Sequence, residues 1–248
     1  MPDSTSALSN PETTTRSNSS GVKNIVLVHG GLVDGSSWAK VIPLLAAQGF
    51  HATAVQNSLT SLAADVAATT RAIARQDGPV LLVGHSWGGM VITEAGDNPQ
   101  VAGLAYVSAY APEAGQSLAE AAQQGPAAPG RQEMRPDAAG FVTITRQGMD
   151  YYLGHDLPAA ERELLLATQQ PLSGAATMQK VSAAAWQTRP SWYLITTEDR
   201  MISPELQRTM AEKIKATTRT LASGHLPMLS HPDAIAAFIL EAARQVGQ

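Results

Sequence analysis

The chain has 248 residues, no cysteine and a formal net charge of −4 at pH 7. This length suits one large α/β domain that buries most of its apolar surface. The lack of cysteine excludes a disulfide framework, a thiolate nucleophile and a cysteine-based metal site. The negative charge, without any Lys or Arg cluster, argues against nucleic acid or an anionic membrane as the main partner and favours a small neutral or weakly polar ligand.

Residues 1–21 are rich in Ser, Thr, Asn and Pro and contain no apolar run. This composition predicts a disordered leader, and neither a secretory signal nor a membrane anchor. A cytoplasmic location is therefore expected by default. We expect the folded domain to span residues 22–248.

Strands and helices are predicted to alternate in the first half of the chain. A helix capped by Ser36 or Ser37 is expected to end near Gln48, with Gly49 as its stop signal. A second helical pattern occupies 58–76. Continuous apolar or β-branched runs predict strands at 24–28, 51–55, from Val80, and at 101–107. The alternation predicts a doubly wound, mainly parallel sheet.

The stretch 80–89, VLLVGHSWGG, matches G-x-S-x-G between a strand and a helix. Such a turn places its central residue, Ser86, at a strained corner, with glycines on both sides because a Cβ there would collide with backbone. The hydroxyl of Ser86 should then stand above the edge of the sheet. At the end of the first strand, 29–31 read HGG and offer flexible backbone amides where an oxyanion hole needs donors.

The alternation breaks between about Tyr110 and Arg189, where Gln, Pro, Gly and Ala dominate. Short helical patterns in this region predict an inserted helical cap over the strand ends. The cap carries Tyr151, Tyr152 and Trp186, which either line a substrate cavity or join the cap to the core.

The regular pattern resumes after the cap. A strand at 191–197 is followed by Glu198 and Asp199, and a helix should begin at Ser203 and Pro204 and run to about Lys215. The last strand, 217–221, leads to Gly224 and His225. The apolar face of a final helix follows at Ile235, Phe238, Ile239 and Ala242.

A serine nucleophile requires a base, and the base requires an orienting acid. Of the six histidines, His29, His51, His85 and His155 lie in turns, an ordinary strand or the cap. His225 follows the last strand and is the candidate base, with His231 as a lesser alternative at the start of the final helix. Asp199 is the candidate acid. Glu198 is its alternative, and Asp199 could also be a plain helix-start carboxylate.

These residues predict a division of labour. Ser86 attacks a carbonyl carbon, His225 takes and returns the proton, and Asp199 fixes the imidazole tautomer. The backbone N–H groups of Gly31 and Trp87 would bind the oxyanion, and Trp87 lies at a helix N-terminus. Neither a metal nor an organic cofactor is implied.

The four blocks HGG (29–31), GHSWGG (84–89), TTEDRMISPELQR (196–208) and SGHLPML (223–229) resemble the α/β-hydrolase superfamily. More specifically, they are similar to its small branch of bacterial esterase-like hydrolases, plant methylesterases and hydroxynitrile lyases. The resemblance extends from about Val22 to the end and is weakest in the cap. It implies an α/β-hydrolase fold with a Ser–Asp–His triad.

The resemblance also separates two chemistries. Hydroxynitrile lyases of this fold carry Thr directly after the first-strand His and Lys directly after the catalytic His, whereas this chain has Gly30 and Leu226. The resemblance therefore implies a cofactor-independent serine carboxylesterase acting on small, largely apolar esters. Lyase or perhydrolase chemistry on the same triad, and a receptor-like protein with slow turnover, remain alternatives. The natural ester and the oligomeric state stay open.

Candidate substrate-binding residues are Leu32, Tyr110, Tyr152, Trp186 and Leu226.

Overall fold

The centre of the protein is a six-stranded parallel sheet with strand order β2-β1-β3-β4-β8-β9. The computed structural model describes residues 21–246, so the predicted leader lies almost wholly outside the described part. All residues of β1, β3 and β8 are buried, as expected for parallel strands covered on both faces. The doubly wound parallel sheet predicted from the sequence is confirmed. Its strands are β1 (Asn24–Val28), β2 (His51–Ala54), β3 (Val80–His85), β4 (Val101–Val107), β8 (Ser191–Thr196) and β9 (Thr217–Leu221).

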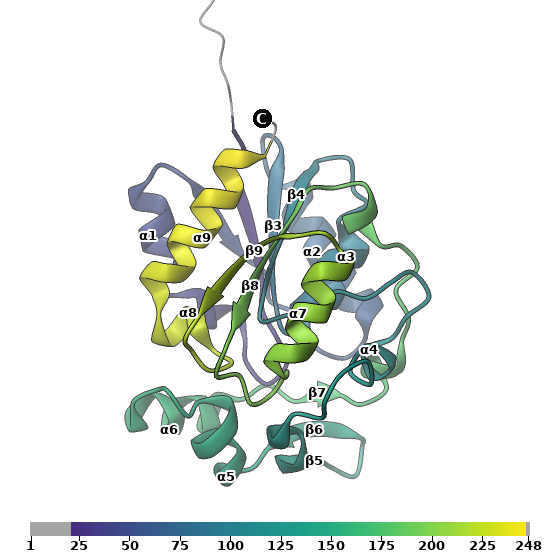
Figure 1. Ribbon diagram of the computed structural model, residues 1–248, viewed down its shortest axis with the longest axis vertical. Helices are drawn as coiled ribbons and strands as arrows, with labels where there is room; N and C mark the ends of the chain where they lie inside the picture. The colour runs from purple at the N-terminus through teal and green to yellow at the C-terminus, as the bar shows by residue number, and fades with distance from the viewer. Residues whose placement is uncertain (1–20, 247–248) are drawn as a thin grey trace, which may run out of the picture.

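Helices cover both faces of this sheet (Figure 1). On one face lie α1 (Ile42–Ala47) and α9 (Pro232–Gln245), and on the other α2 (Leu62–Ala74), α3 (Gly88–Ala95) and α7 (Pro204–Lys213). Alternate residues of β1 serve the two sides: Ile25 joins the core beneath α9, and Val26 the core beneath α2 and α3. Among residues 21–246, no helix is long and apolar enough to cross a membrane.

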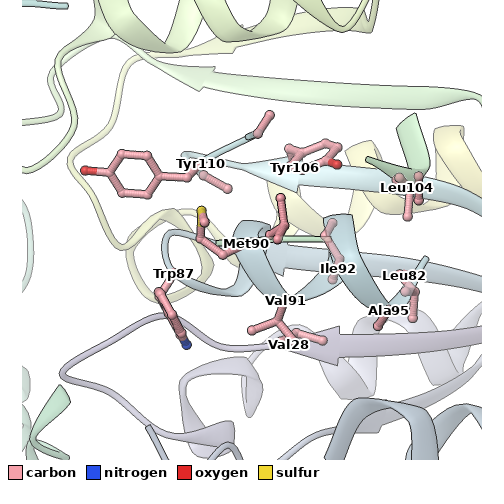
Figure 2. Close-up of a cluster of buried hydrophobic side chains, with 14 of the residues drawn as sticks. Val28, Leu82, Trp87, Met90, Val91, Ile92, Ala95, Leu104, Tyr106 and Tyr110 are labelled. Atoms are coloured by element: carbon pink, nitrogen blue, oxygen red, sulfur yellow. The ribbon is translucent and has the colours of Figure 1, made fainter. Parts of the chain in front are cut away.

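Helix α3 is the most deeply embedded of these helices. Figure 2 shows its side chains Met90, Val91 and Ile92 packed among residues of the neighbouring strands, and all three are fully buried. Thr93 lies among them and satisfies its hydroxyl through Gly89 O (2.7 Å) and the Tyr106 hydroxyl (2.8 Å). A helix held this firmly fixes the direction of the turn that precedes it.

The first predicted helix is split in the structure. A 3₁₀ turn (Gly35–Trp38) is capped by Asp34, whose side chain accepts a hydrogen bond from the Ser36 N–H at 2.6 Å. Helix α1 then starts anew at Ile42 with Pro43 in its first turn. The prediction that Ser36 or Ser37 caps the start of this helix was therefore wrong, because the side chain of Asp34 provides the capping oxygen at an earlier position.

The segment between β4 and β8 lies over the carboxyl ends of the sheet strands, at the bottom of Figure 1. It contains short helices, as the general pattern predicted, and they are α4 (Leu118–Ala121), α5 (Arg146–Gly148) and α6 (Ala159–Thr168). It also contains an antiparallel sheet that the sequence did not indicate, because strands of two to four residues are too short to show alternation. That sheet consists of β5 (Met134–Pro136), β6 (Phe141–Ile144) and β7 (Leu172–Ser173). We call this whole segment the cap.

Candidate active site

Ser86 sits at a sharp turn between β3 and α3, with its backbone in the left-handed region at φ +51°. A Cβ added at Gly84 would lie 2.6 Å from Gly88 O, and one added at Gly88 would lie 2.4 Å from Val28 O. The collision with backbone expected at both glycines is therefore present. The turn exists in this form because its flanking residues have no side chain.

We expect Gly88→Ala to destabilise the protein strongly, because the backbone oxygen of Val28 cannot move out of the way as a flexible side chain could. Overpacking of this kind costs about 3 kcal/mol. That corresponds to a fall in melting temperature of roughly 6–12 °C for a domain of this size. Gly78→Ala is the matched control, because its nearest atom, Asn24 Nδ2, lies 3.5 Å away. Equal melting temperatures for the two variants, measured by thermal unfolding, would contradict the steric account.

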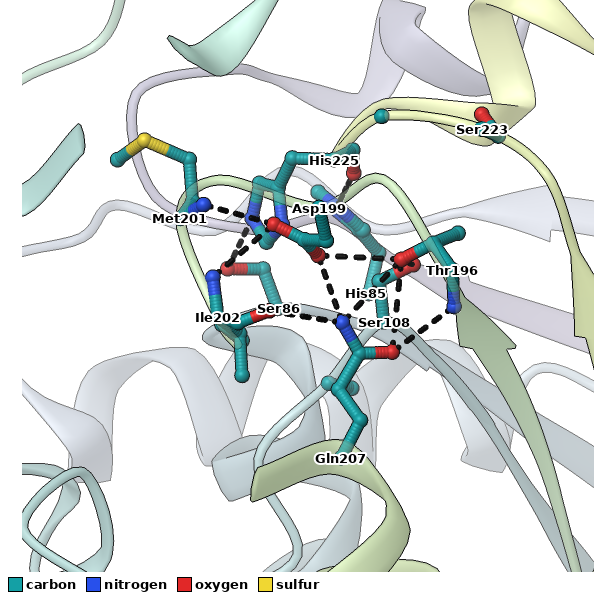
Figure 3. A network of polar contacts seen from close by, with 12 residues as sticks. His85, Ser86, Ser108, Thr196, Asp199, Met201, Ile202, Gln207, Ser223 and His225 are labelled. Atoms are coloured by element: carbon teal, nitrogen blue, oxygen red, sulfur yellow. Dashed lines mark hydrogen bonds and ion pairs between the residues drawn. The ribbon is translucent and has the colours of Figure 1, made fainter. Parts of the chain in front are cut away.

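Ser86, His225 and Asp199 form a continuous hydrogen-bonded chain (Figure 3). The Ser86 Oγ lies 2.9 Å from His225 Nε2, and His225 Nδ1 lies 2.8 Å from Asp199 Oδ2. Because an ionised carboxylate only accepts, Nδ1 carries the proton and Nε2 is free to accept from the serine hydroxyl. This is the tautomer in which imidazole can act as a base toward Ser86.

The carboxylate of Asp199 is buried and held on both oxygens. Its Oδ1 accepts hydrogen bonds from the N–H groups of Met201 (2.7 Å) and Ile202 (3.0 Å). Its Oδ2 accepts from the Gln207 side-chain amide at 2.8 Å and from the Thr196 hydroxyl at 3.1 Å. These donors compensate the desolvation of a buried charge and fix the direction of the carboxylate.

Gln207 is a part of the site that sequence reasoning missed. It is fully buried on α7, and its Oε1 accepts from the Thr196 N–H at 3.0 Å. That contact sets the orientation of the amide, so that its nitrogen faces Asp199. The available signal was a glutamine on the apolar face of the helix, beside the buried Leu206 and Met210.

The alternatives for base and acid lie elsewhere. Glu198 is exposed at the end of β8, whereas its neighbour Asp199 turns inward. His231 occupies the N-cap position of α9, and its Nδ1 lies 2.9 Å from Ser230 Oγ. The structure therefore brings Asp199 and His225 to Ser86, and neither Glu198 nor His231.

Two further histidines are buried beside this chain of residues. His29 Nε2 accepts from the Asn57 N–H at 2.9 Å, so its Nδ1–H donates to Gly30 O at 2.8 Å. His85 Nε2 lies 2.8 Å from the carbonyl oxygen of His225. Burial lowers the pKa of His29, and burial followed by the charge of nearby His225 lowers the pKa of His85 well below its usual value. Both histidines are therefore neutral structural parts of the site.

The depressed pKa values predict a loss of stability in mild acid. The unfolded chain binds protons at these histidines as the pH falls through about 6.5, whereas the folded chain does not. The free energy of unfolding should therefore be highest above pH 7 and decrease below pH 6.5. At pH 5.5 the decrease should be at most roughly 1.4 kcal/mol per histidine. Urea unfolding at pH 7.5 and 5.5 measures this change. A free energy of unfolding that stays constant or rises on acidification would refute the conclusion that His29 and His85 are neutral in the folded protein.

Gly31 and Trp87 present backbone N–H groups near Ser86. Among residues 21–246, neither N–H donates a hydrogen bond, and both residues line the same cavity as Ser86. The Trp87 indole donates to the buried carboxylate of Asp65 at 2.8 Å, which holds the residue after Ser86 in place. Two free donors beside a serine hydroxyl are the arrangement that stabilises an oxyanion.

A cap residue, Asp156, holds the loop that carries His225. Its Oδ2 accepts hydrogen bonds from the Gly224 N–H at 2.8 Å and the Ser223 hydroxyl at 3.0 Å. Burial opposes ionisation of Asp156, but hydrogen bonds from Gly224, Ser230 and Ser223 outweigh it and hold the pKa of the carboxyl below its usual value. A Cβ on Gly224 would lie 2.6 Å from Asp156 Oδ1, so a larger residue at this position would displace the carboxylate.

Comparison with known proteins identifies the family. The sequence pattern described as "Alpha/beta hydrolase family" matches residues 25–238 of this chain. The chain belongs to the alpha/beta hydrolase family. It is therefore an enzyme of the hydrolase class, as the resemblance of its four sequence blocks implied.

Curated and solved relatives of this hydrolase cover most of its length. Methylesterase 8 from Arabidopsis thaliana is 24% identical over 243 residues, 89% of this chain and 89% of the relative. Salicylic acid-binding protein 2 from Nicotiana tabacum is 26% identical over 254 residues, 90% and 98% of the two chains. The crystal structure of a pyrethroid hydrolase from Sphingobium faniae superposes with a TM-score of 0.77 at 22% identity, covering 90% and 98%. At that identity, the structural likeness shows the fold.

The hydrolase has a cavity of about 290 Å³ between the sheet edge and the cap, and Ser86 and His225 lie in its wall. Of the residues predicted to contact substrate, Leu32 and Tyr110 line it. The remaining wall is mainly apolar and comes largely from the cap, including Leu118, Met134, Val142, Leu153 and Leu172, with Met201 and Ile202 added from the loop after β8. A cavity of this size and character fits a small apolar ligand.

Three predicted substrate contacts do not line this cavity of the hydrolase. The Trp186 indole donates to Pro112 O at 2.7 Å and its ring packs on the core, which is the joining role left open by the sequence. Leu226 is fully buried in the core beneath α9, because the chain turns inward after His225. Tyr152 is half-buried and packs against the same core.

Proposed function

We propose that this hydrolase is a serine carboxylesterase that cleaves small, largely apolar carboxylic esters through an acyl-enzyme. The observation that carries the proposal is the hydrogen-bonded chain from Asp199 through His225 to Ser86, which ends in an apolar cavity. Nucleophile, base and acid in this order are what attack on an ester carbonyl needs.

Acylation begins when the Ser86 hydroxyl attacks the carbonyl carbon and passes its proton to His225 Nε2, 2.9 Å away. Asp199 stabilises the resulting imidazolium through Nδ1–H. The negative charge forms on the former carbonyl oxygen and is bound by the N–H groups of Gly31 and Trp87. Collapse of this intermediate breaks the ester bond, and His225 gives its proton to the leaving alcohol.

Deacylation uses the same groups in reverse. Water enters beside the acyl-enzyme, His225 takes its proton, and hydroxide adds to the acyl carbon. The oxyanion occupies the same two donors, and expulsion of the Ser86 oxygen, reprotonated by His225, releases the carboxylic acid.

Two observations support ester hydrolysis over lyase chemistry. Curated relatives that cover about nine-tenths of the chain are named methylesterases and pyrethroid hydrolase. The residue after His225 is a fully buried leucine, so it places no ammonium group beside a departing cyanide. Expulsion of cyanide needs such charge stabilisation, whereas expulsion of an alcohol needs only the proton held by His225.

Initial rates on p-nitrophenyl esters of increasing acyl length test the proposal. We expect rates to pass through a maximum at short to medium chains, since the cavity holds about 290 Å³. Mandelonitrile cleavage, measured in parallel, should be absent. Failure to hydrolyse any member of the series, together with mandelonitrile cleavage or tight ligand binding without turnover, would overturn the assignment.

A further inference from the structure

The cavity wall contains polar groups that the proposed reaction does not use. Ser86 and His225 are partners of one another, and the Thr177 hydroxyl donates to a backbone carbonyl at 2.7 Å. Tyr110 and Arg131 also line the cavity. Within residues 21–246, neither the Tyr110 hydroxyl nor the Arg131 guanidinium has a hydrogen-bond or ion-pair partner. An otherwise apolar cavity with two polar side chains that have no partner in the protein indicates what a ligand can offer there.

Tyr110 is fixed close to the nucleophile. Its backbone N–H donates to Ser86 O at 3.2 Å, and only 6% of its surface is exposed. Figure 2 shows its oxygen pointing away from the packed side chains around Met90 and Tyr106. Burial raises the pKa of Tyr110 to about 12, with the charge of Arg131 acting in the opposite direction. The hydroxyl therefore stays protonated at neutral pH and can donate to an acceptor on the ligand.

Arg131 lies on a short 3₁₀ turn of the cap, Pro129–Glu133. The acid on this turn, Glu133, is paired with Arg135 at 3.6 Å and accepts a hydrogen bond from Thr145. Among the described residues that line the cavity, Arg131 is the one with a permanently charged side chain. Its planar guanidinium offers parallel donors in the geometry that matches a carboxylate.

We propose that Arg131 and the Tyr110 hydroxyl form a carboxylate subsite, and that the preferred esters carry a carboxylate on the part of the molecule away from the scissile bond. This inference rests on the proposed esterase function and refines its substrate class. The apolar wall then contacts the hydrocarbon that joins the ester to the carboxylate.

Matched ester pairs test the preference. Mono-p-nitrophenyl adipate is compared with p-nitrophenyl 6-methylheptanoate, in which an isopropyl group replaces the carboxylate. A second pair, 4-acetoxybenzoate and 4-isopropylphenyl acetate, places the charge on the alcohol side. We expect kcat/KM to favour the carboxylate in at least one pair by about tenfold or more, as a charge-assisted hydrogen bond would give. No preference in either pair overturns the inference.

Variants assign the preference to the two side chains. Arg131→Gln should abolish most of the carboxylate-to-neutral ratio, Arg131→Lys should retain part of it, and Tyr110→Phe should reduce it. Arg75→Gln is the matched control. Arg75 is also exposed, but it follows α2 near the amino ends of the strands, whereas the cavity lies at their carboxyl ends. Because Arg131 is exposed, the ratio should also shrink at 1 M salt, where the screening length is about 3 Å. A ratio equal in Arg131→Gln and Arg75→Gln would refute the role of Arg131.

Ligand binding separates failure of the subsite from failure of the esterase. Ser86→Ala protein is titrated calorimetrically with monomethyl adipate and with methyl 6-methylheptanoate. The carboxylate ligand should bind about tenfold more tightly, and Ser86→Ala/Arg131→Gln should lose this difference. Turnover without the preference leaves the esterase and overturns the subsite. The binding preference without wild-type turnover leaves the subsite and overturns the esterase.

Discussion

Ser86→Ala should lower kcat for p-nitrophenyl esters by about 10⁴- to 10⁶-fold, because the variant lacks the oxygen that forms the acyl-enzyme. Residual turnover above the uncatalysed rate would come from the free N–H donors of Gly31 and Trp87, which the substitution leaves in place. Among residues 21–246, His225 is the hydrogen-bond partner of the Ser86 hydroxyl, so the fold should be retained without that oxygen.

Two measurements complete this test. A melting temperature close to that of the wild type shows that the loss is chemical. Rapid-quench detection of an acyl adduct in the wild type and its absence from Ser86→Ala identify the nucleophile. Near wild-type turnover by the variant would exclude Ser86 from that role.

Asp199→Asn should lower kcat by about 10⁴-fold, although the asparagine side chain has nearly the same shape as that of aspartate. An amide nitrogen at the position of Oδ2 would donate to His225 Nδ1 and so place the imidazole proton on Nε2. A protonated Nε2 cannot accept the hydrogen bond from the Ser86 hydroxyl. The same nitrogen would oppose the Gln207 amide, which now donates to Oδ2 at 2.8 Å. Both effects act on the base, so kcat should fall far more than KM rises.

Glu198→Gln is the matched control for this substitution. It removes the same charge from the adjacent residue, whose side chain is exposed. Its kcat should equal that of the wild type. Equal losses in the two variants would show that the general field of the loop, and not the contact with His225, is responsible.

The sheet was largely predictable because its strands are buried on both faces and therefore appear as continuous apolar runs. The predicted bounds of β1, β4 and β9 match the structure to the residue. Position along the chain then indicated which polar residues meet, since loops after parallel strands share one edge of the sheet. Ser86, Asp199 and His225 follow β3, β8 and β9 and lie together there.

The cavity could not be read in the same way. Its wall comes mainly from the cap, where strands are two to four residues long and exposed helices carry little periodic signal. Tyr152 and Trp186 were candidates because they are aromatic residues of the predicted cap, yet the Trp186 indole donates to Pro112 O outside the cavity. Arg131 was missed because a single exposed arginine in a loop looks like any solvated charge until its surroundings are known.

The hydrogen bonds that Asp156 accepts from Ser223 and Gly224 affect how substrate selectivity can change among such enzymes. Asp156, which holds the loop that carries His225, belongs to the same insertion that shapes the cavity. A cap exchanged for that of a relative would therefore alter the alignment of His225 together with the selectivity, unless an equivalent carboxylate came with it. We therefore expect substrate selectivity and the alignment of His225 to change together, and chimeras should be designed so that Asp156 and Gly224 come from the same parent protein.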